Sequence, residues 1–210
     1  MPFAFKANCT VLTFGVTMSG KSHFVLDCLK NRLIYPMPKT IYYVYKLHQP
    51  IFSTWNENPK NPFINFINNN GLDIKQLDFS QPSALVLDDI LLELSSSLSE
   101  VAIYGSHHLK ITVFFITQLL YCKNEIYRTI ASNSRYMILF HSFRNSGQIE
   151  CLARQNFPGK AGKALVEAYK EASNHLFSPV VVNFNTEFAK EGVQIIFDFW
   201  SEWPTIFTQS

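Results

Sequence analysis

The stretch that decides the fold runs from residue 15 to residue 22 and reads Gly-Val-Thr-Met-Ser-Gly-Lys-Ser. It matches G-x-x-x-x-G-K-[ST], the pattern of the phosphate-binding P-loop. In such a loop glycines let the backbone wrap closely around a polyphosphate, and N–H groups at a helix N-terminus supply positive potential. The sequence therefore predicts a nucleotide-binding loop formed by Gly15, Val16, Thr17, Met18, Ser19, Gly20, Lys21 and Ser22.

The residues on either side of the loop support this interpretation. A β-prone run over 9–14 precedes it, and apolar residues recur near helical spacing over 22–33. A chance match in a Gly/Ser turn is the alternative, and a strand before and a helix after the loop argue against it. Within the loop, we expect Lys21 to reach the β- and γ-phosphates of ATP and the Ser22 hydroxyl to ligate Mg²⁺.

Composition and charge narrow the class of protein. The 210 residues suit one domain, and a content of 47% hydrophobic and 15% aromatic residues is ample for a buried core. Charged residues make up 16%, below the usual quarter or so, which favours an oligomer with part of its surface covered. A net charge of +2 does not indicate generalised coating of nucleic acid, although it leaves room for a local basic patch.

Two further features bear on location. The four cysteines lack C-x-x-C pairing, which indicates scattered, reduced thiols. The N-terminus lacks a signal-peptide pattern, and no apolar run reaches the roughly 18 residues of a membrane span. We therefore expect a soluble intracellular protein.

Strand-like and helix-like segments alternate along the chain. Continuously apolar runs such as 83–88 and 111–117 are typical of parallel strands buried on both faces. Further strands are expected at 40–46, 135–141 and 179–184, the last at an edge, and helices at 90–104, 123–131, 147–155 and 162–172. This alternation predicts an α/β fold with a mainly parallel central sheet and helices on both faces. Together with the P-loop, this arrangement resembles that of the RecA/ASCE-like P-loop NTPases.

The predicted domain, residues 1–184, contains one interruption and is followed by an extension. The stretch 47–82 is rich in Asn and Pro, so we expect an irregular surface excursion with one short helix near 63–67. The C-terminal extension, 185–210, contains Trp200 and Trp203 and is expected to pack on the same domain.

Two acidic residues end one apolar strand. Residues 84–89 read Ala-Leu-Val-Leu-Asp-Asp, the form of a Walker B element. Because the C-terminal ends of parallel strands meet at the ligand edge, Asp88 is expected near the Mg²⁺ bound by Ser22. Asp89 is the better candidate to orient or deprotonate the attacking water. The alternative is a pair of acids that start a helix.

Polar residues after later strands extend the predicted site. Gln118 follows the strand that ends at Thr117 and is a candidate to sense the γ-phosphate or hold the water. The alternative is an ordinary solvent-exposed amide at a strand end. A finger arginine donated across a subunit interface would complete such a site. Arg144, in a loop just after a strand, is favoured over Arg135, which opens a strand, and Arg128, in a short helix.

Several segments occur together in an order that resembles one family. They are the P-loop, Leu87-Asp88-Asp89, Gly105-Ser106-His107-His108 leading into Ile116-Thr117-Gln118, Asn133-Ser134-Arg135-Tyr136, and Leu152-Ala153-Arg154-Gln155. Over about residues 9–172 the chain resembles the FtsK/HerA-type genome-packaging ATPases of Polinton/Maverick elements, adintoviruses and virophages. The resemblance implies a homo-oligomeric ring inside a host cell, in nucleus or cytoplasm, that hydrolyses ATP and drives double-stranded DNA into a preformed capsid at its portal or vertex proteins.

The resemblance also implies roles for individual residues. Lys21 and Ser22 would be phosphate and Mg²⁺ ligands, Asp88 and Asp89 the Walker B pair, and Gln118 the sensor. Many relatives carry Glu where this chain has Asp89, whose side chain is one methylene shorter. The finger arginine does not transfer, because three arginines compete for the role.

Without the resemblance, the residues predict only that the protein is a P-loop nucleoside triphosphatase. A small nucleotide kinase is the enzyme alternative, and a nucleotide-dependent switch or assembly protein is a third class. The double Asp and the Thr-Gln strand end suit a water-activating hydrolase better than a kinase.

Overall fold

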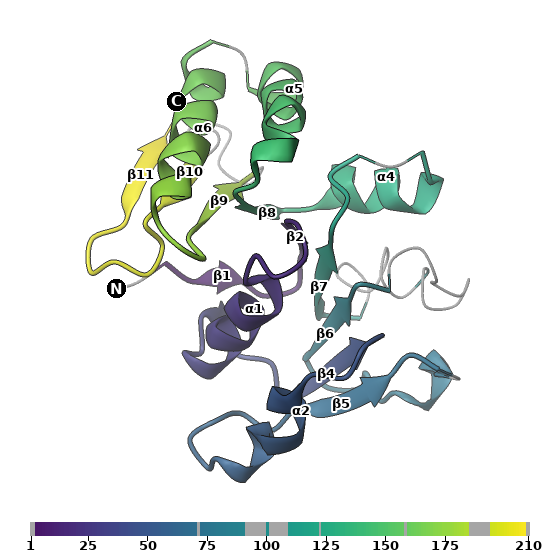
Figure 1. The fold of residues 1–210 in the computed structure, drawn as a ribbon. Helices are drawn as coiled ribbons and strands as arrows, with labels where there is room; N and C mark the ends of the chain where they lie inside the picture. The colour runs from purple at the N-terminus through teal and green to yellow at the C-terminus, as the bar shows by residue number, and fades with distance from the viewer. Residues whose placement is uncertain are drawn as a thin grey trace.

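A nine-stranded sheet runs through the molecule in the order β11-β10-β9-β8-β2-β7-β6-β4-β5 (Figure 1). The computed structural model describes residues 3–70, 72–90, 100, 109–121, 123–157, 159–184 and 194–208. The parallel strands are β2 (Thr10–Phe14), β4 (Thr40–Tyr45), β5 (Asn65–Asn68), β6 (Ser83–Asp88), β7 (Ile111–Thr117) and β8 (Tyr136–Phe140). The antiparallel strands are β9 (Pro179–Asn183), β10 (Gln194–Phe197) and β11 (Thr205–Thr208).

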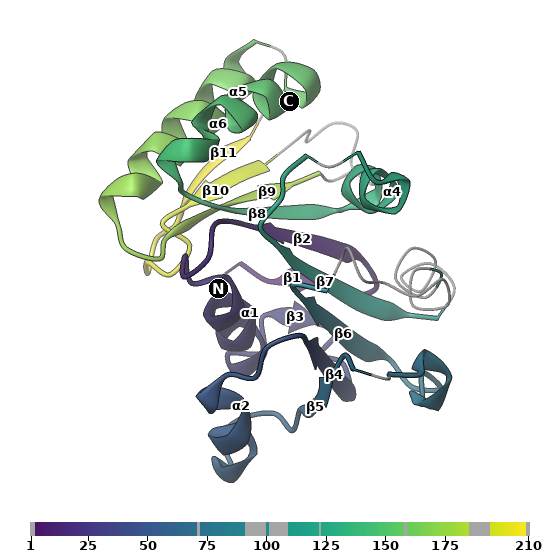
Figure 2. The ribbon, with the colours of Figure 1, turned by 45° about the vertical axis from the view of Figure 1, so that its right-hand side comes forward.

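Helices cover both faces of this sheet, as Figure 2 shows. On one face lie α1 (Lys21–Lys30) and α2 (Pro50–Thr54). On the other lie α4 (Glu125–Asn133), α5 (Ser146–Asn156) and α6 (Lys160–Glu171). Short 3-10 turns, and a separate parallel pair of two-residue strands, complete the described elements: η1 (Trp55–Glu57), η2 (Ile74–Gln76), η4 (Phe143–Asn145), η5 (Ala172–Asn174), β1 (Phe5–Lys6) and β3 (Ile34–Tyr35).

Alternating side chains of the strands divide the core into two hydrophobic clusters. Leu12 of β2 packs in the cluster that contains Leu152 of α5, whereas its neighbour Val11 packs in the cluster that contains Val25 of α1. Every residue of β2, β6, β7, β8 and β9 is buried. The predicted α/β fold, with continuously apolar parallel strands between helices, is therefore confirmed.

The predicted elements agree with the described ones to within a few residues at their ends, with two exceptions and one gap. The strands predicted at 83–88 and 111–117 have those bounds. The helix predicted at 90–104 falls largely on residues 91–99 and 101–108, outside the described part of the chain.

The helix predicted near 63–67 is wrong, because this segment contributes the edge strand β5. Asn65–Asn68 pairs in parallel with β4, and the Asn65 side-chain amide donates to the Ile41 carbonyl at 3.2 Å. The Phe66 ring stacks on Phe52 of α2 with centroids 4.8 Å apart. Non-local pairing and aromatic packing thus outweigh the local sequence signal, and the helix of this region starts instead at Pro50, which suits a first helical position.

The expected edge position of the 179–184 strand is also wrong. β9 lies between β8 and β10, and β11 continues the sheet beyond β10. The residues after 193 therefore supply β10, which pairs with the outer side of β9, and β11, which pairs with β10. Across the residues that the structure describes, no helix has both the length and the apolar character needed to cross a membrane.

Candidate functional site

The P-loop connects the C-terminal end of β2 to the N-terminus of α1, and both of its glycines are required by geometry. A Cβ atom on Gly15 would lie 2.6 Å from the Ser19 hydroxyl oxygen and 2.7 Å from Cβ of Phe140, so no larger residue fits. Gly20 immediately precedes α1 with φ of 96°, a conformation that other residues rarely adopt. The Gly15 N–H donates to the Thr117 carbonyl at 3.2 Å, which ties the loop to the end of β7.

Lys21 places a buried cation against this loop. Its side chain is only 7% exposed, and its ammonium group donates to the Val16 carbonyl at 2.7 Å. Burial lowers the pKa of Lys21, whereas the carboxylates of Asp89 and Asp88 act in the opposite direction. The loop therefore combines two features. Its glycines let the backbone adopt conformations that other residues would block, and the Lys21 ammonium group lies close to two carboxylates.

Asp88 is the acid that faces α1. The Ser22 hydroxyl donates to its Oδ2 atom at 2.8 Å, and the Tyr43 hydroxyl donates to the same atom at 2.7 Å. Burial raises the pKa of Asp88, and these two hydrogen bonds lower it. A hydroxyl and a carboxylate are the hard oxygen ligands that Mg²⁺ prefers, so the donor set of Ser22 and Asp88 fits this ion.

Asp89 turns away from Asp88 and joins a second set of contacts. Its backbone has φ of 58° and its N–H donates to the Ile116 carbonyl at 3.0 Å, so the chain leaves the line of β6 at this residue. The Gln118 amide donates to the Asp89 carboxylate at 2.6 Å, and the Thr17 hydroxyl donates to the Gln118 amide oxygen at 3.0 Å. A hydrogen-bonded chain of three side chains therefore links the P-loop to the ends of β7 and β6.

The sheet register explains why these residues meet. Strand β7 lies between β2 and β6, and Phe14 pairs with Thr117 while Asp88 pairs with Ile116. The three strands end almost level, so the residues that follow them share one edge. The Gln118 side chain is exposed, yet both of its polar atoms are hydrogen-bonded, which distinguishes it from an ordinary solvent-exposed amide.

Arg144 lies at the same edge of the sheet, in η4, just after the C-terminal end of β8. Its side chain is exposed, and among the residues that the structure describes no hydrogen bond or ion pair involves it.

The other two arginines lie elsewhere. Arg135 precedes β8 at the opposite edge of the sheet, where its N–H donates to the Thr10 carbonyl and its guanidinium lies 5.7 Å from the Tyr136 ring centroid. Arg128 lies on α4, with an exposed ion pair of 3.8 Å to Glu125.

Tyr43 is the residue at this site that the sequence did not single out. It lies on β4 with no exposed surface, and burial together with the Asp88 charge raises the pKa of its hydroxyl well above the usual value. The available signal was a hydroxyl-bearing aromatic residue inside an apolar strand, which predicts a buried hydrogen-bond partner without identifying it.

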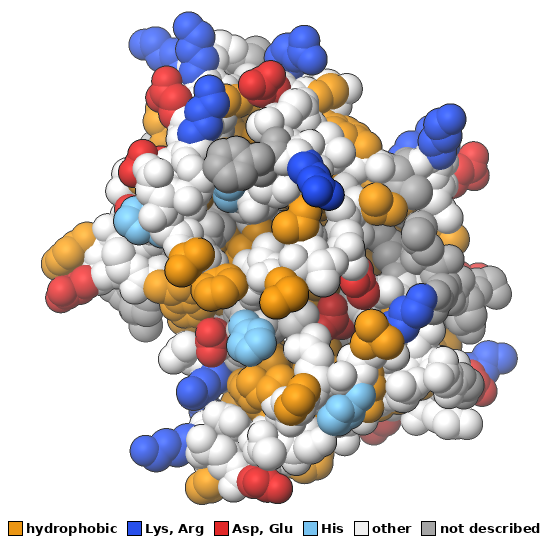
Figure 3. Space-filling model, in the orientation of Figure 1, with side chains coloured by type: hydrophobic (Ala, Val, Ile, Leu, Met, Phe, Trp, Pro, Cys, Tyr) orange, Lys and Arg blue, Asp and Glu red, His pale blue; other side chains and the backbone are white. Residues whose placement is uncertain are grey.

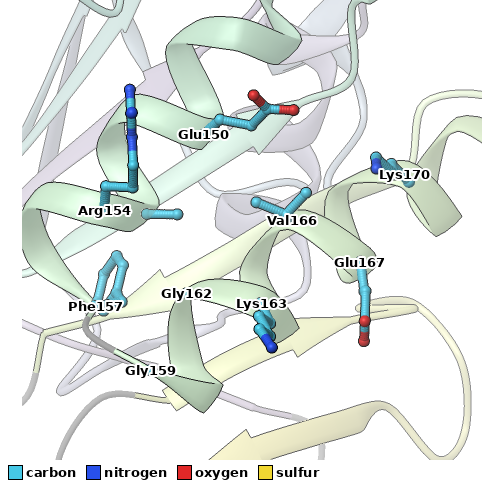
Figure 4. A pocket seen from close by; sticks show the side chains of 10 residues that line it. Glu150, Arg154, Phe157, Gly159, Gly162, Lys163, Val166, Glu167 and Lys170 are labelled. Atoms are coloured by element: carbon cyan, nitrogen blue, oxygen red, sulfur yellow. The ribbon is translucent and has the colours of Figure 1, made fainter.

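Hollows on the described surface include one beside the P-loop and one on the opposite side of the sheet. One, of about 710 Å³, lies beside the P-loop and is lined by Thr17, Met18, Ser19, Gly20, Lys21, Ser22, His23, Phe24, Asp27, Gln49, Leu176, Phe177 and Trp200. The other, of about 570 Å³, lies between α5 and α6 (Figure 4). It carries both signs of charge, Glu150 and Glu167 beside Arg154, Lys163 and Lys170, and no P-loop residue lines it. The first hollow is therefore the one adjacent to the predicted chemistry.

Comparison with known proteins supports the fold. No protein-family model matches this sequence, and no curated protein matches it either. The structure is similar to the genome-packaging NTPase B204 of Sulfolobus turreted icosahedral virus 2 in complex with ATPγS, with a TM-score of 0.55 and 13% identity over 90% of this chain and 96% of that chain. It is also similar to B204, the DNA-packaging ATPase of Sulfolobus turreted icosahedral virus, with a TM-score of 0.54 and 13% identity over 90% of this chain and 97% of that chain. The chain therefore has the fold of the P-loop NTPases.

The contact between Tyr43 and Asp88 yields a first prediction. Tyr43→Phe removes one donor from a buried carboxylate, and the free energy of unfolding should fall by about 1.5–3 kcal/mol, as measured by urea denaturation at pH 7. Loss of the donor also raises the pKa of Asp88, so any Mg²⁺-dependent activity should fail at a higher pH in the variant than in the wild type as the solution is acidified.

The control is Tyr45→Phe, which removes a hydroxyl from the same strand. Tyr45 is half-buried, and no hydrogen bond of its hydroxyl occurs within the described chain. Equal losses of stability in the two variants would contradict a specific role for the Tyr43 hydroxyl.

Proposed function

We propose that this protein is an ATP-hydrolysing motor that translocates double-stranded viral DNA into a capsid. The observation that carries the enzymatic part is the hydrogen-bonded chain from Thr17 through Gln118 to Asp89, set beside the contact between Ser22 and Asp88. This arrangement provides separate groups for the phosphates, the metal and the water within one edge of the sheet.

In this proposal the P-loop holds the triphosphate and Lys21 supplies charge to its β- and γ-phosphates. Ser22 and Asp88 would hold Mg²⁺, which when bound neutralises charge on the phosphate oxygens. For Lys21 this requires only that its ammonium group leave the neutral Val16 carbonyl for a phosphate oxygen, which as an anion is the stronger acceptor.

Asp89 is the proposed group for the attacking water, as a carboxylate that orients it and accepts its proton. Gln118 holds one oxygen of this carboxylate, so the direction of Asp89 depends on Gln118 and, through it, on Thr17 of the P-loop. In this proposal, phosphate binding in the loop changes the position of Asp89, the residue that orients the water, through Thr17 and Gln118. A kinase would have to exclude water from the same position, and no contact among the described residues favours that alternative.

The packaging role rests on two similarities. The sequence resembles genome-packaging ATPases over its motifs, and the fold extends over nearly the whole of B204, which has been solved with ATPγS and with AMPPCP. By analogy, the partners would be further copies of this chain in a ring, double-stranded DNA, and portal or vertex proteins of a capsid, inside a host cell. The exposed Arg144 at the ligand edge, and the low charged fraction of the chain, suit a site completed between subunits.

The discriminating measurement is ATP hydrolysis with and without double-stranded DNA across a range of protein concentrations. A motor should show turnover per chain that rises with protein concentration and is stimulated by DNA. Turnover per chain that does not depend on protein concentration and is not changed by DNA would instead support a kinase or a switch.

The role of Lys21 gives a second prediction. Lys21→Ala should lower the rate of ATP hydrolysis at least about 100-fold and weaken nucleotide binding, because the loop loses the charge that stabilises the transferring phosphoryl group. Lys30→Ala is the control, since Lys30 is exposed at the far end of the same helix. Wild-type turnover in the Lys21 variant would rule out the P-loop assignment.

The separate contacts of the two acids give a third prediction. Asp89→Asn should keep binding of Mg²⁺ and ATP nearly unchanged while it lowers turnover about 10²–10⁴-fold, because the amide cannot accept the proton of water. Binding is measured by calorimetry and turnover by phosphate release. Loss of metal-dependent binding would mean that Asp88 and Asp89 share or exchange their roles.

Arg144 gives a fourth prediction, which concerns assembly. Arg144→Ala should cost about 10³-fold or more in turnover if Arg144 acts on the site of a neighbouring subunit. Mixing Arg144→Ala chains with Lys21→Ala chains should then restore part of the activity, because the first supply an intact P-loop and the second an intact arginine. Mixtures that assemble but stay inactive would move the assignment to Arg135 or Arg128.

A further inference from the structure

The hollow beside the P-loop has an apolar side that phosphate chemistry does not use. Leu176 and Phe177, between η5 and β9, and Trp200, after β10, line it together with the loop. Their exposed fractions are 90%, 62% and 46%, which is high for side chains of this size. Figure 3 shows hydrophobic side chains gathered where the segment after α6 meets the start of α1. An exposed apolar group that lines a pocket indicates a ligand surface.

Phe177 lies directly against the P-loop. Its ring atom Cδ1 lies 2.9 Å from the position that a Cβ on Gly20 would occupy. The Phe177 backbone has φ of 59°, which is uncommon for an aromatic residue and is maintained only where the surroundings require it. The Phe177 ring therefore lies at the border between the phosphate loop and the rest of the pocket.

Trp200, in the segment after β10, packs against helix α1, which follows the P-loop. Its ring centroid lies 5.2 Å from that of Phe24, in the first turn of α1, and 5.0 Å from that of Phe199. Phe24 and Phe199 are buried, so they form a rigid support beneath a tryptophan ring that stays nearly half exposed. An indole held in this way presents a flat apolar surface at little cost in side-chain entropy.

The direction of the pocket identifies which part of a nucleotide would reach these rings. Asp88, Asp89 and Gln118 do not line the hollow, so it extends away from the end of the loop where the γ-phosphate is expected. It continues instead past His23 and Asp27, which follow each other on successive turns of α1. A triphosphate bound at Lys21 would therefore place its sugar and base in this part of the pocket.

We propose that Trp200 and Phe177 form a stacking surface for the base of the bound nucleotide. This inference rests on the proposed binding of nucleotide at the P-loop. The ligand class is a nucleoside triphosphate, recognised by its aromatic base as well as by its phosphates. Because every base has a π-face, stacking on these rings favours bound nucleosides over inorganic polyphosphate without selecting strongly among bases.

The experiment compares Trp200→Ala with Trp203→Ala. Trp203 lies three residues further along the same connection, is 83% exposed and does not line the pocket. Calorimetry measures the binding of AMPPCP with Mg²⁺, and of inorganic tripolyphosphate with Mg²⁺, which has no base. Trp200→Ala should weaken AMPPCP binding about tenfold and leave tripolyphosphate binding unchanged, whereas Trp203→Ala should change neither.

A conservative variant keeps the test sharp if alanine disturbs the fold. Trp200→Phe retains an aromatic face and should keep most of the AMPPCP affinity. AMPPCP should also quench the tryptophan fluorescence of the wild type, tripolyphosphate should not, and the quenching should disappear in Trp200→Phe because the remaining tryptophans, Trp55 and Trp203, lie outside the pocket.

The outcomes separate this inference from the proposed function. Equal affinity of the wild type for AMPPCP and tripolyphosphate would overturn the stacking surface alone. An equal loss of affinity for AMPPCP and for tripolyphosphate in Trp200→Ala would do the same. A wild type that binds neither ligand would overturn the P-loop assignment and the stacking surface with it.

Discussion

The buried carboxylate of Asp88 imposes the constraint on which the arrangement of the site depends. A carboxylate that is only 7% exposed is costly unless its oxygens are hydrogen-bonded, and here one oxygen accepts from both Ser22 and Tyr43. These donors come from α1 and β4, whereas Asp88 ends β6. The helix after the P-loop, the acidic strand and its neighbour must therefore take up one relative position. That position also sets where Lys21 and the P-loop lie.

Strand β7 has a comparable role on the other side of the acidic pair. It separates the strand that leads into the P-loop from the strand that ends in Asp88, and it supplies the Thr117 and Ile116 carbonyls that accept from Gly15 and Asp89. Gln118 continues from the same strand end. The spacing between the phosphate loop and Asp89 is thus one strand wide, which a single glutamine side chain can bridge.

Local patterns in the sequence predicted the parts of this structure that depend on neighbours in the chain. The P-loop and the apolar strands at 83–88 and 111–117 follow from glycine spacing and unbroken hydrophobicity, and the shared edge of Gln118 and Asp89 follows from parallel topology. The role of Tyr43, the strand β5 and the interior position of β9 depend on partners far along the chain, which no local period encodes. Segment Asn65–Asn68 has weak strand character by itself and becomes a strand because β4 and Phe52 are beside it.

The hollow beside the P-loop joins residues from both ends of the described chain, and this has a consequence for biosynthesis. Among the residues of this pocket, those of the P-loop leave the ribosome before the others, and Trp200 follows almost 180 residues later. At translation rates of about 5–20 residues per second this interval is roughly 9 to 36 seconds. For most of that time the nascent chain contains the residues of the phosphate loop but not those of β9, of β10 or of the tryptophan that lines the pocket. The complete pocket can form only in a chain whose sheet has been extended as far as β10, so its assembly is a late event in the maturation of the polypeptide.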